Sequence, residues 1–181
     1  MYRCVYYSKP VFDKLKSMAS NEDFLKLSSG VGEERTKRQY LVELVVRFVV
    51  LRNYRYKIGL DVHEYLDKGI MDIAEDNDFN WELEEDIFAR TMKALLGGVG
   101  AEAFSKNNRF SLAMFEFISL GLSKAIQSSD TALAPEFVRA KVASVADLPQ
   151  AQRYSGSGVR GTQRLASFVV PLAERYFAQI A

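Results

Sequence analysis

The stretch LVELVVRFVVL, residues 41–51, decides the fold because nine of its residues are apolar and only two are charged. The two charged residues belong to a polar set that recurs every four positions: Arg35, Gln39, Glu43 and Arg47. That spacing places the polar side chains in one stripe on a helix. The five valines would also suit a strand, but the four-residue period and the length favour a helix. We therefore predict a central, buried helix over residues 33–53.

Further helical patterns lie on both sides of this stretch, several of them opened by residue types that cap helix N-termini. The expected segments are residues 8–18, 21–27, 60–75, 80–96, 109–126, 135–145 and 162–180, the last of them kinked or restarted at Pro171. No alternating strand pattern, hairpin signal, internal repeat or long linker is evident. The sequence predicts an all-α fold, a single domain over residues 1–181 built as a multi-helix bundle of about seven to eight helices.

The composition of the 181-residue chain, with 48% hydrophobic and 26% charged residues, is that of an ordinary globular domain. A net charge of +1 gives no global attraction to nucleic acid, so any basic surface requires local segregation of charge. Cys4 is the only cysteine, and the N-terminus has no apolar signal segment. No apolar run approaches the roughly 20 residues of a bilayer span. We expect a cytoplasmic protein without a membrane partner.

The segment RYSGSGVRGTQR, residues 153–164, contains a Gly-x-Gly-x-x-Gly motif that matches the phosphate-binding fingerprint of dinucleotide-binding folds. That fingerprint needs a preceding strand and an acidic residue about 20 positions later, and neither is found around this motif. As a P-loop the motif lacks its lysine, because Thr162 stands in that place. We interpret the segment as a flexible loop before a helix, with phosphate binding by its arginines as the alternative.

Acidic residues gather between positions 72 and 86, where eight carboxylates occur without a basic residue. The motif Asp76-x-Asp78-x-Asn80 begins like a calcium-binding loop, but Trp81 and Ile87 occupy the positions that need glycine and glutamate. We interpret the stretch as a solvated acidic face with helix-start charges, and clustered carboxylates around a divalent metal are the alternative.

Other candidates for chemistry are isolated residues. His63 and Cys4 are the only histidine and cysteine, and they have no metal-ligand spacing. Glu116 is a lone acid in an apolar segment, and we expect it to form a salt bridge or to point outwards. The sequence therefore predicts no catalytic residue, no metal site and no cofactor.

Basic and aromatic residues mix directly after the central stretch, in Arg52-Asn-Tyr54-Arg55-Tyr56-Lys57. A simple structural explanation is that cations are favoured at a helix C-terminus. The functional hypothesis is a nucleic-acid contact in which bases stack on tyrosine and phosphates pair with arginine. With the arginines of the glycine loop, the candidate DNA- or phosphate-binding residues are Arg52, Tyr54, Arg55, Lys57, Arg153, Arg160 and Arg164.

Several segments, taken in order, resemble a known family. They are residues 3–15 (RCVYYSKPVFDKL), Asn21-Glu-Asp-Phe24, Arg35-Thr-Lys-Arg38 and the run from Leu41 to Phe48. This order is similar to the helical C-terminal half of the GmrS-type, ParB-like family of domains of unknown function, which includes subunits of modification-dependent restriction and anti-phage systems. Residues 109–117 and the closing glycine loop are similar to the same half.

The sequence departs from that family in one respect. The family's nucleotide-handling chemistry is associated with an N-terminal ParB-like module carrying an Asp-Gly-Gln-Gln-Arg motif, and this string does not occur in the chain. The resemblance therefore implies an all-helical accessory half without catalytic residues, which contacts DNA, a partner nuclease or the missing module.

Three functional hypotheses follow. The first is a non-catalytic accessory module of a restriction or anti-phage defence system that binds DNA or a protein partner carrying the missing module. The second is a metal- or nucleotide-dependent enzyme of the nuclease or NTPase type, which a thermal shift with magnesium, manganese or nucleotide would reveal. The third is an orphan structural fragment that forms a homodimer through the surface the missing module would cover. We favour the first.

Overall fold

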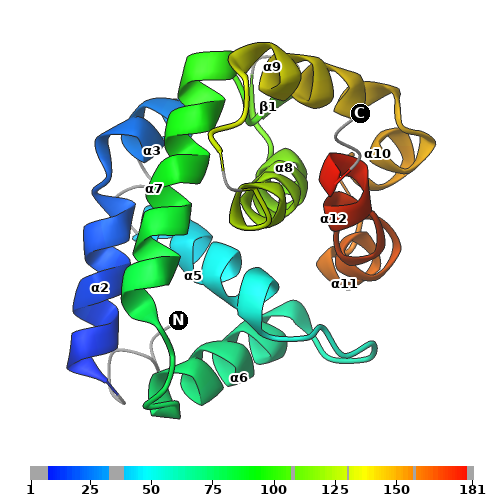
Figure 1. The fold of residues 1–181 in the computed structure, drawn as a ribbon. Coiled ribbons are helices and arrows are strands. Elements are labelled where there is room, and N and C mark those ends of the chain that lie inside the picture. Colours follow the sequence, from blue (N-terminus) through cyan, green and yellow to red (C-terminus); the bar gives the residue numbers. More distant parts are fainter. Residues whose placement is uncertain (1–7, 33–38, 107–108, 130, 157, 179–181) are drawn as a thin grey trace.

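Helices make up most of the part of the chain that the structure describes. The computed structural model describes residues 8–32, 39–106, 109–129, 131–156 and 158–178 (Figure 1). Strand structure within these ranges is limited to β1 (Ser105–Lys106) and β2 (Arg109–Phe110), which pair antiparallel. The predicted all-α class and multi-helix arrangement are therefore confirmed.

The first half of the described chain consists mainly of helices. They are α2 (Lys9–Ala19), α3 (Glu22–Leu27), α5 (Tyr40–Asn53), α6 (Val62–Glu75) and α7 (Trp81–Gly98). The predicted caps of α3 and α7 are confirmed, because Asn21 accepts a hydrogen bond from the Phe24 amide and Asn80 from the Leu83 amide, both at 3.0 Å. Asp61 caps α6 in the same way through the amide of His63.

The second half begins with the β1–β2 pair and continues in helices. They are α8 (Leu112–Gln127), α9 (Pro135–Ser144), the 3₁₀ turn η1 (Val145–Asp147), α10 (Pro149–Tyr154), α11 (Gly161–Arg164), the π-helical turn η2 (Leu165–Val169) and α12 (Val170–Ala178). The sequence does not predict α10 or the strand pair. The helix predicted from residue 109 begins only at Leu112, because Ser111 caps α8 and the two residues before it pair with β1.

The predicted disturbance near Pro171 takes the form of η2, the π-helical turn directly before α12. Proline lacks an N–H group and cannot donate the helical hydrogen bond to the carbonyl four residues earlier. A π-helical turn is a common local adjustment of a helix. The C-terminal run thus stays helical from Gly161 to Ala178 but changes its hydrogen-bonding pattern before Pro171.

The predicted central helix is shorter than the sequence pattern suggests. Gln39 adopts a left-handed conformation with a φ of 58°, so α5 begins at Tyr40, and residues 33–38 lie outside the described residues. Within α5 the burial is as predicted, since most of its residues, including Arg47 and Arg52, are shielded from solvent. The predicted polar stripe is thus reduced in α5 to Glu43 and Arg47, which form an ion pair at 2.8 Å.

Helix α8 shares the centre of the molecule with α5. Thirteen of its sixteen residues are buried, and it packs against α5, α7 and α12. Figure 1 shows α8 enclosed by α7, α9 and α12. Aromatic side chains also fill the space between α3, α5 and α7: Phe24 and Phe48 both meet Phe88 edge to face, with ring centroids 5.3 and 5.0 Å apart.

Candidate nucleic-acid interface

The segment from Tyr54 to Leu60 connects α5 to α6, and the side chains of its residues 54–57 alternate between inward and outward positions. Tyr54 leaves α5 in an extended conformation, and successive side chains of an extended chain point to opposite sides. Tyr56 is accordingly buried, whereas Arg55 and Lys57 are exposed. The chain then turns at Gly59, whose φ of 103° is favourable for glycine.

Three tyrosines hold the base of this segment against α6. The Tyr65 hydroxyl donates to the backbone oxygen of Tyr54 at 2.7 Å, and the Tyr56 and Tyr65 rings meet edge to face at 5.0 Å. Burial raises the pKa of Tyr65, and a hydrogen bond to the Asp72 carboxylate raises the pKa of Tyr54. Tyr54, predicted to stack on a base, is half-buried, and its ring lies 5.9 Å from that of Tyr65. It therefore supports the loop.

Arg52, which the sequence suggested as a phosphate contact, lies inside the molecule. It is 6% exposed, and its guanidinium donates to the Glu84 carboxylate of α7 at 2.8 Å and to Gln127 of α8 at 3.0 Å. Its backbone oxygen accepts from Lys124 at 2.9 Å. A phosphate would have to displace Glu84 from a buried ion pair, so Arg52 joins helices rather than presenting a free cation.

Arg164 is engaged in the same way at the other candidate segment. Its guanidinium donates to the two carboxylate oxygens of Glu116, with a shortest distance of 2.7 Å, and its side chain is 12% exposed. Glu116 is fully buried and also pairs with Arg47 at 2.8 Å. The expectation that Glu116 forms a salt bridge is confirmed, and Arg164 does not present a free guanidinium to solvent.

The remaining arginines of the glycine loop are exposed. Arg160 directly precedes α11, and Arg153 lies on α10 with its guanidinium 5.4 Å from the Tyr154 ring. Gly158 has a φ of 88°, and Gly161 allows close approach of α6, because a Cβ there would lie 2.9 Å from a Val62 methyl group. Gly158 therefore has a conformational role and Gly161 a packing role.

The structure brings the two predicted basic segments together at one edge. The Tyr56 hydroxyl donates to the backbone oxygen of Thr162 at 3.5 Å, and Gly161 contacts Val62 at the start of α6. Figure 1 shows the loop between α5 and α6 reaching towards α11. We define the exposed cations of these adjoining loops, Arg55, Lys57 and Arg160, as the basic edge. Arg153 is exposed but belongs to α10 and is not included.

The acidic stretch stays mostly at the surface, except for Glu84, which is buried beside Arg52. The Asp76 carboxylate accepts a hydrogen bond from the backbone amide of Asp78 at 2.9 Å, as in an ordinary turn. Among the described residues, no group of three or more histidine, cysteine, aspartate or glutamate side chains has a geometry that could hold a metal ion. His63 is exposed on α6, and Cys4 lies outside the described residues.

Sequence reasoning missed one exposed residue of this edge. Ile58 is 87% exposed between Lys57 and Gly59, an unusual position for a large apolar side chain. The sequence signal that could have indicated this exposure is an isoleucine between a lysine and a glycine, outside any helical pattern of apolar residues. The burial of Arg52 and Arg164 had no local signal, because their carboxylate partners are 32 and 48 positions away.

Comparison with known proteins gives no match to a protein-family model, to a curated protein or to a solved structure. In the parts of the chain that the structure describes, no helix combines the length and apolarity needed to cross a bilayer. The candidate interface therefore rests on its own geometry.

Proposed function

We propose that this chain is a non-catalytic helical module that contacts the phosphate backbone of DNA through the basic edge, as an accessory part of a restriction or anti-phage defence system. The strongest support is that the exposed cations of the basic edge have no ion-pair partner among the described residues, whereas the buried arginines do. Arg55, Lys57 and Arg160 are exposed and form no ion pair with any described residue, whereas Arg47, Arg52 and Arg164 are engaged with the buried carboxylates of Glu84 and Glu116. The defence setting is the one that the family resemblance implies.

The physical argument begins with the cost of binding. An unpaired, exposed cation gives up only water and counterions when it meets a phosphate, and counterion release favours association. Tyr56 and Tyr65 hold the base of the loop that carries Arg55 and Lys57. Less conformational entropy of the loop is therefore lost when DNA binds. Contacts of this kind position a protein on DNA without reading its sequence. We therefore expect salt-sensitive binding with little sequence preference.

Fluorescence anisotropy with a short labelled duplex, plain or carrying modified cytosine, tests this proposal. We expect binding at low salt that weakens between about 50 and 200 mM salt. The triple variant Arg55→Ala, Lys57→Ala and Arg160→Ala removes up to three phosphate contacts. The slope of log affinity against log salt concentration should then become shallower by about 2 to 3, since each contact contributes about 0.9.

The matched control removes the same charge from helices that do not carry the basic edge. Lys16, Lys26 and Lys93 are exposed on α2, α3 and α7, and replacing all three with alanine should leave the slope close to the wild-type value. Equal slopes for the two triple variants would contradict the assignment to the basic edge. Absence of binding to both duplexes at low salt would contradict the DNA contact itself and would direct the search to a protein partner.

A further inference from the structure

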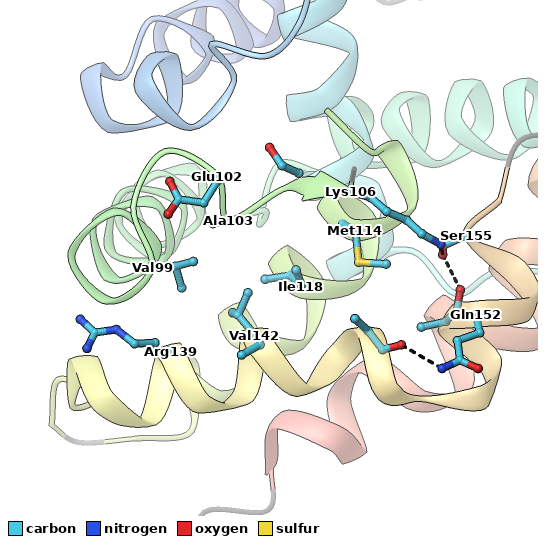
Figure 2. A pocket seen from close by; sticks show the side chains of 14 residues that line it. Val99, Glu102, Ala103, Lys106, Met114, Ile118, Arg139, Val142, Gln152 and Ser155 are labelled. Atoms are coloured by element: carbon cyan, nitrogen blue, oxygen red, sulfur yellow. Dashed lines mark hydrogen bonds between the residues drawn. The ribbon is translucent and has the colours of Figure 1, made fainter. Parts of the chain in front are cut away.

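A cavity of about 430 Å³ opens between the β1 region, α8, α9 and α10. Its volume lies within the range of sites that hold small molecules, about 300–1,000 Å³. Met114, Ile118 and Val142 line it with apolar side chains (Figure 2). Four alanines also line the cavity, and their small side chains help to leave the space open: Ala103, Ala143, Ala146 and Ala151.

One end of the cavity carries an ammonium group without a carboxylate partner. Lys106 is partly buried, and its ammonium donates to the Ser155 hydroxyl at 2.6 Å. The Ser155 hydroxyl in turn donates to the backbone oxygen of Ala151. Among the described residues no carboxylate pairs with Lys106, and Ser155 is the one acceptor that its three N–H donors meet there. Figure 2 shows Gln152 at the same end.

The opposite end has a different character. Arg139 donates to the backbone oxygen of Gly98 at 2.8 Å, and the Glu102 carboxylate folds back over Gly100, where a Cβ would come within 3.0 Å of it. Figure 2 shows Glu102 and Arg139 separated from Lys106 and Ser155 by the apolar side chains of Ile118 and Val142. The ionisable groups lining the cavity are thus two cations and one carboxylate, and the carboxylate lies away from Lys106.

We propose that this cavity binds a small amphiphilic anion, with its apolar body against Met114, Ile118 and Val142 and its carboxylate or phosphate at Lys106. Burial of apolar ligand surface supplies the driving force, and the ammonium selects for a negative charge because charge-assisted hydrogen bonds are strong in a partly dry site. The lining of this cavity includes none of the residues of the basic edge, so a small metabolite could bind to the module whether or not the module binds DNA.

Methionine methyl NMR provides a direct test, because the chain contains five methionines and Met114 lines the cavity. Met18 and Met92 are buried on α2 and α7 and serve as internal references. The probes are naphthalene carboxylate and the uncharged naphthalene methanol, which share the same ring system. We expect a saturable shift of the Met114 signal, with the carboxylate binding about tenfold more tightly than the alcohol.

Variants assign the selectivity to Lys106. Lys106→Met should weaken binding of the carboxylate about tenfold and leave the alcohol unchanged, whereas Lys106→Arg should keep the preference for the carboxylate. Lys93→Met, which removes an exposed lysine from α7, should change neither affinity. No saturable shift at Met114, equal affinities of the two probes for the unmodified protein, or an unchanged carboxylate affinity in Lys106→Met would each overturn the proposal.

Discussion

Glu116 lies in the second turn of α8 with none of its surface exposed, and its oxygens accept hydrogen bonds from Arg47 at 2.8 Å and Arg164 at 2.7 Å. Removing one member of a buried ion pair leaves an uncompensated charge in a medium of low dielectric constant. We therefore expect Glu116→Gln, which keeps the side-chain volume, to lower the free energy of unfolding by about 3 kcal/mol. Urea denaturation followed by circular dichroism measures this loss.

The matched control for this substitution is an exposed pair of the same charge type. Asp86 and Arg90 lie 3.5 Å apart on α7, with about half of each side chain in solvent, at 56% and 43% exposure. Asp86→Asn should cost less than about 1 kcal/mol, because solvent screens exposed pairs. Similar losses for the two variants would show that the Glu116 pairs contribute no more than surface pairs.

Tyr65, which holds the loop after α5, makes the stability of the fold depend on pH. Burial raises the pKa of its phenol above the ordinary value of about 10, at which the unfolded chain would ionise. The native state holds the proton to higher pH, so this contribution to stability is complete below about pH 10 and is lost as the pH rises further.

The variant Tyr65→Phe removes the phenol and tests this coupling. We expect a lower urea midpoint at neutral pH, because the hydrogen bond from Tyr65 to the Tyr54 backbone oxygen is lost. The fall in the midpoint between about pH 8 and about pH 11 should be smaller than in the wild type. An unchanged or steeper fall would argue that other groups govern the alkaline transition.

At the scale of elements, the crossing of α8 and α12 depends on Gly121. A Cβ at this position would lie 2.5 Å from the backbone oxygen of Ala173 and would also overlap the Phe177 ring. Gly97 is also helical, on α7, but nothing lies within 4 Å of a Cβ built there. Alanine has the better helix propensity at both positions, by up to about 1 kcal/mol, and packing decides whether that gain is realised.

Alanine substitution should therefore have opposite signs at the two glycines. Gly121→Ala is expected to destabilise the protein by about 1–3 kcal/mol through overpacking, despite its better helix propensity. Gly97→Ala should stabilise it by about 0.5–1 kcal/mol. Thermal and urea unfolding of the two variants give the signs directly, and a stabilised Gly121→Ala would mean that α12 moves away from α8 at little cost.

The helix starts could be predicted from the sequence because a cap is a contact between near neighbours. Asn21 and Asn80 each bond to the amide three positions later, so a short window of residues contains the whole interaction. The β1–β2 pair could not be predicted, because each strand has only two residues and no alternation can develop. The start of α5 was misplaced because the left-handed turn at Gln39 interrupts the period.

The candidate site could be predicted only in part, because only some of its contacts are between near neighbours in the sequence. Composition drew attention to both basic segments, but whether an arginine faces solvent depends on partners far away in the sequence. Arg52 meets Glu84 and Arg164 meets Glu116 only after the helices have packed. The alternation that exposes Arg55 and Lys57 is local, yet it required knowledge that the chain leaves α5 in an extended conformation.

At the scale of the whole molecule, buried arginines join the helices that the apolar core brings together. Arg52 of α5 reaches Glu84 of α7 and Gln127 of α8, and its guanidinium lies 5.4 Å from the Phe48 ring. Arg47 joins α5 to α8, and Arg164 joins α11 to α8 through the same Glu116. Loss of one of these residues should therefore weaken several helices together rather than one element.

Arg52 and Arg55 are three positions apart, and we expect that substitution of Arg52 lowers stability whereas substitution of Arg55 lowers DNA affinity. Arg52→Ala leaves Glu84 buried without its partner, so we expect a loss of about 3–5 kcal/mol and lower hydrogen-exchange protection in α5, α7 and α8 together. Arg55→Ala changes an exposed side chain and should alter stability by less than about 0.5 kcal/mol while weakening DNA binding at low salt. Protection lost in α5 alone would show that the Arg52 pair is local, and unchanged DNA affinity in Arg55→Ala would remove this residue from the basic edge.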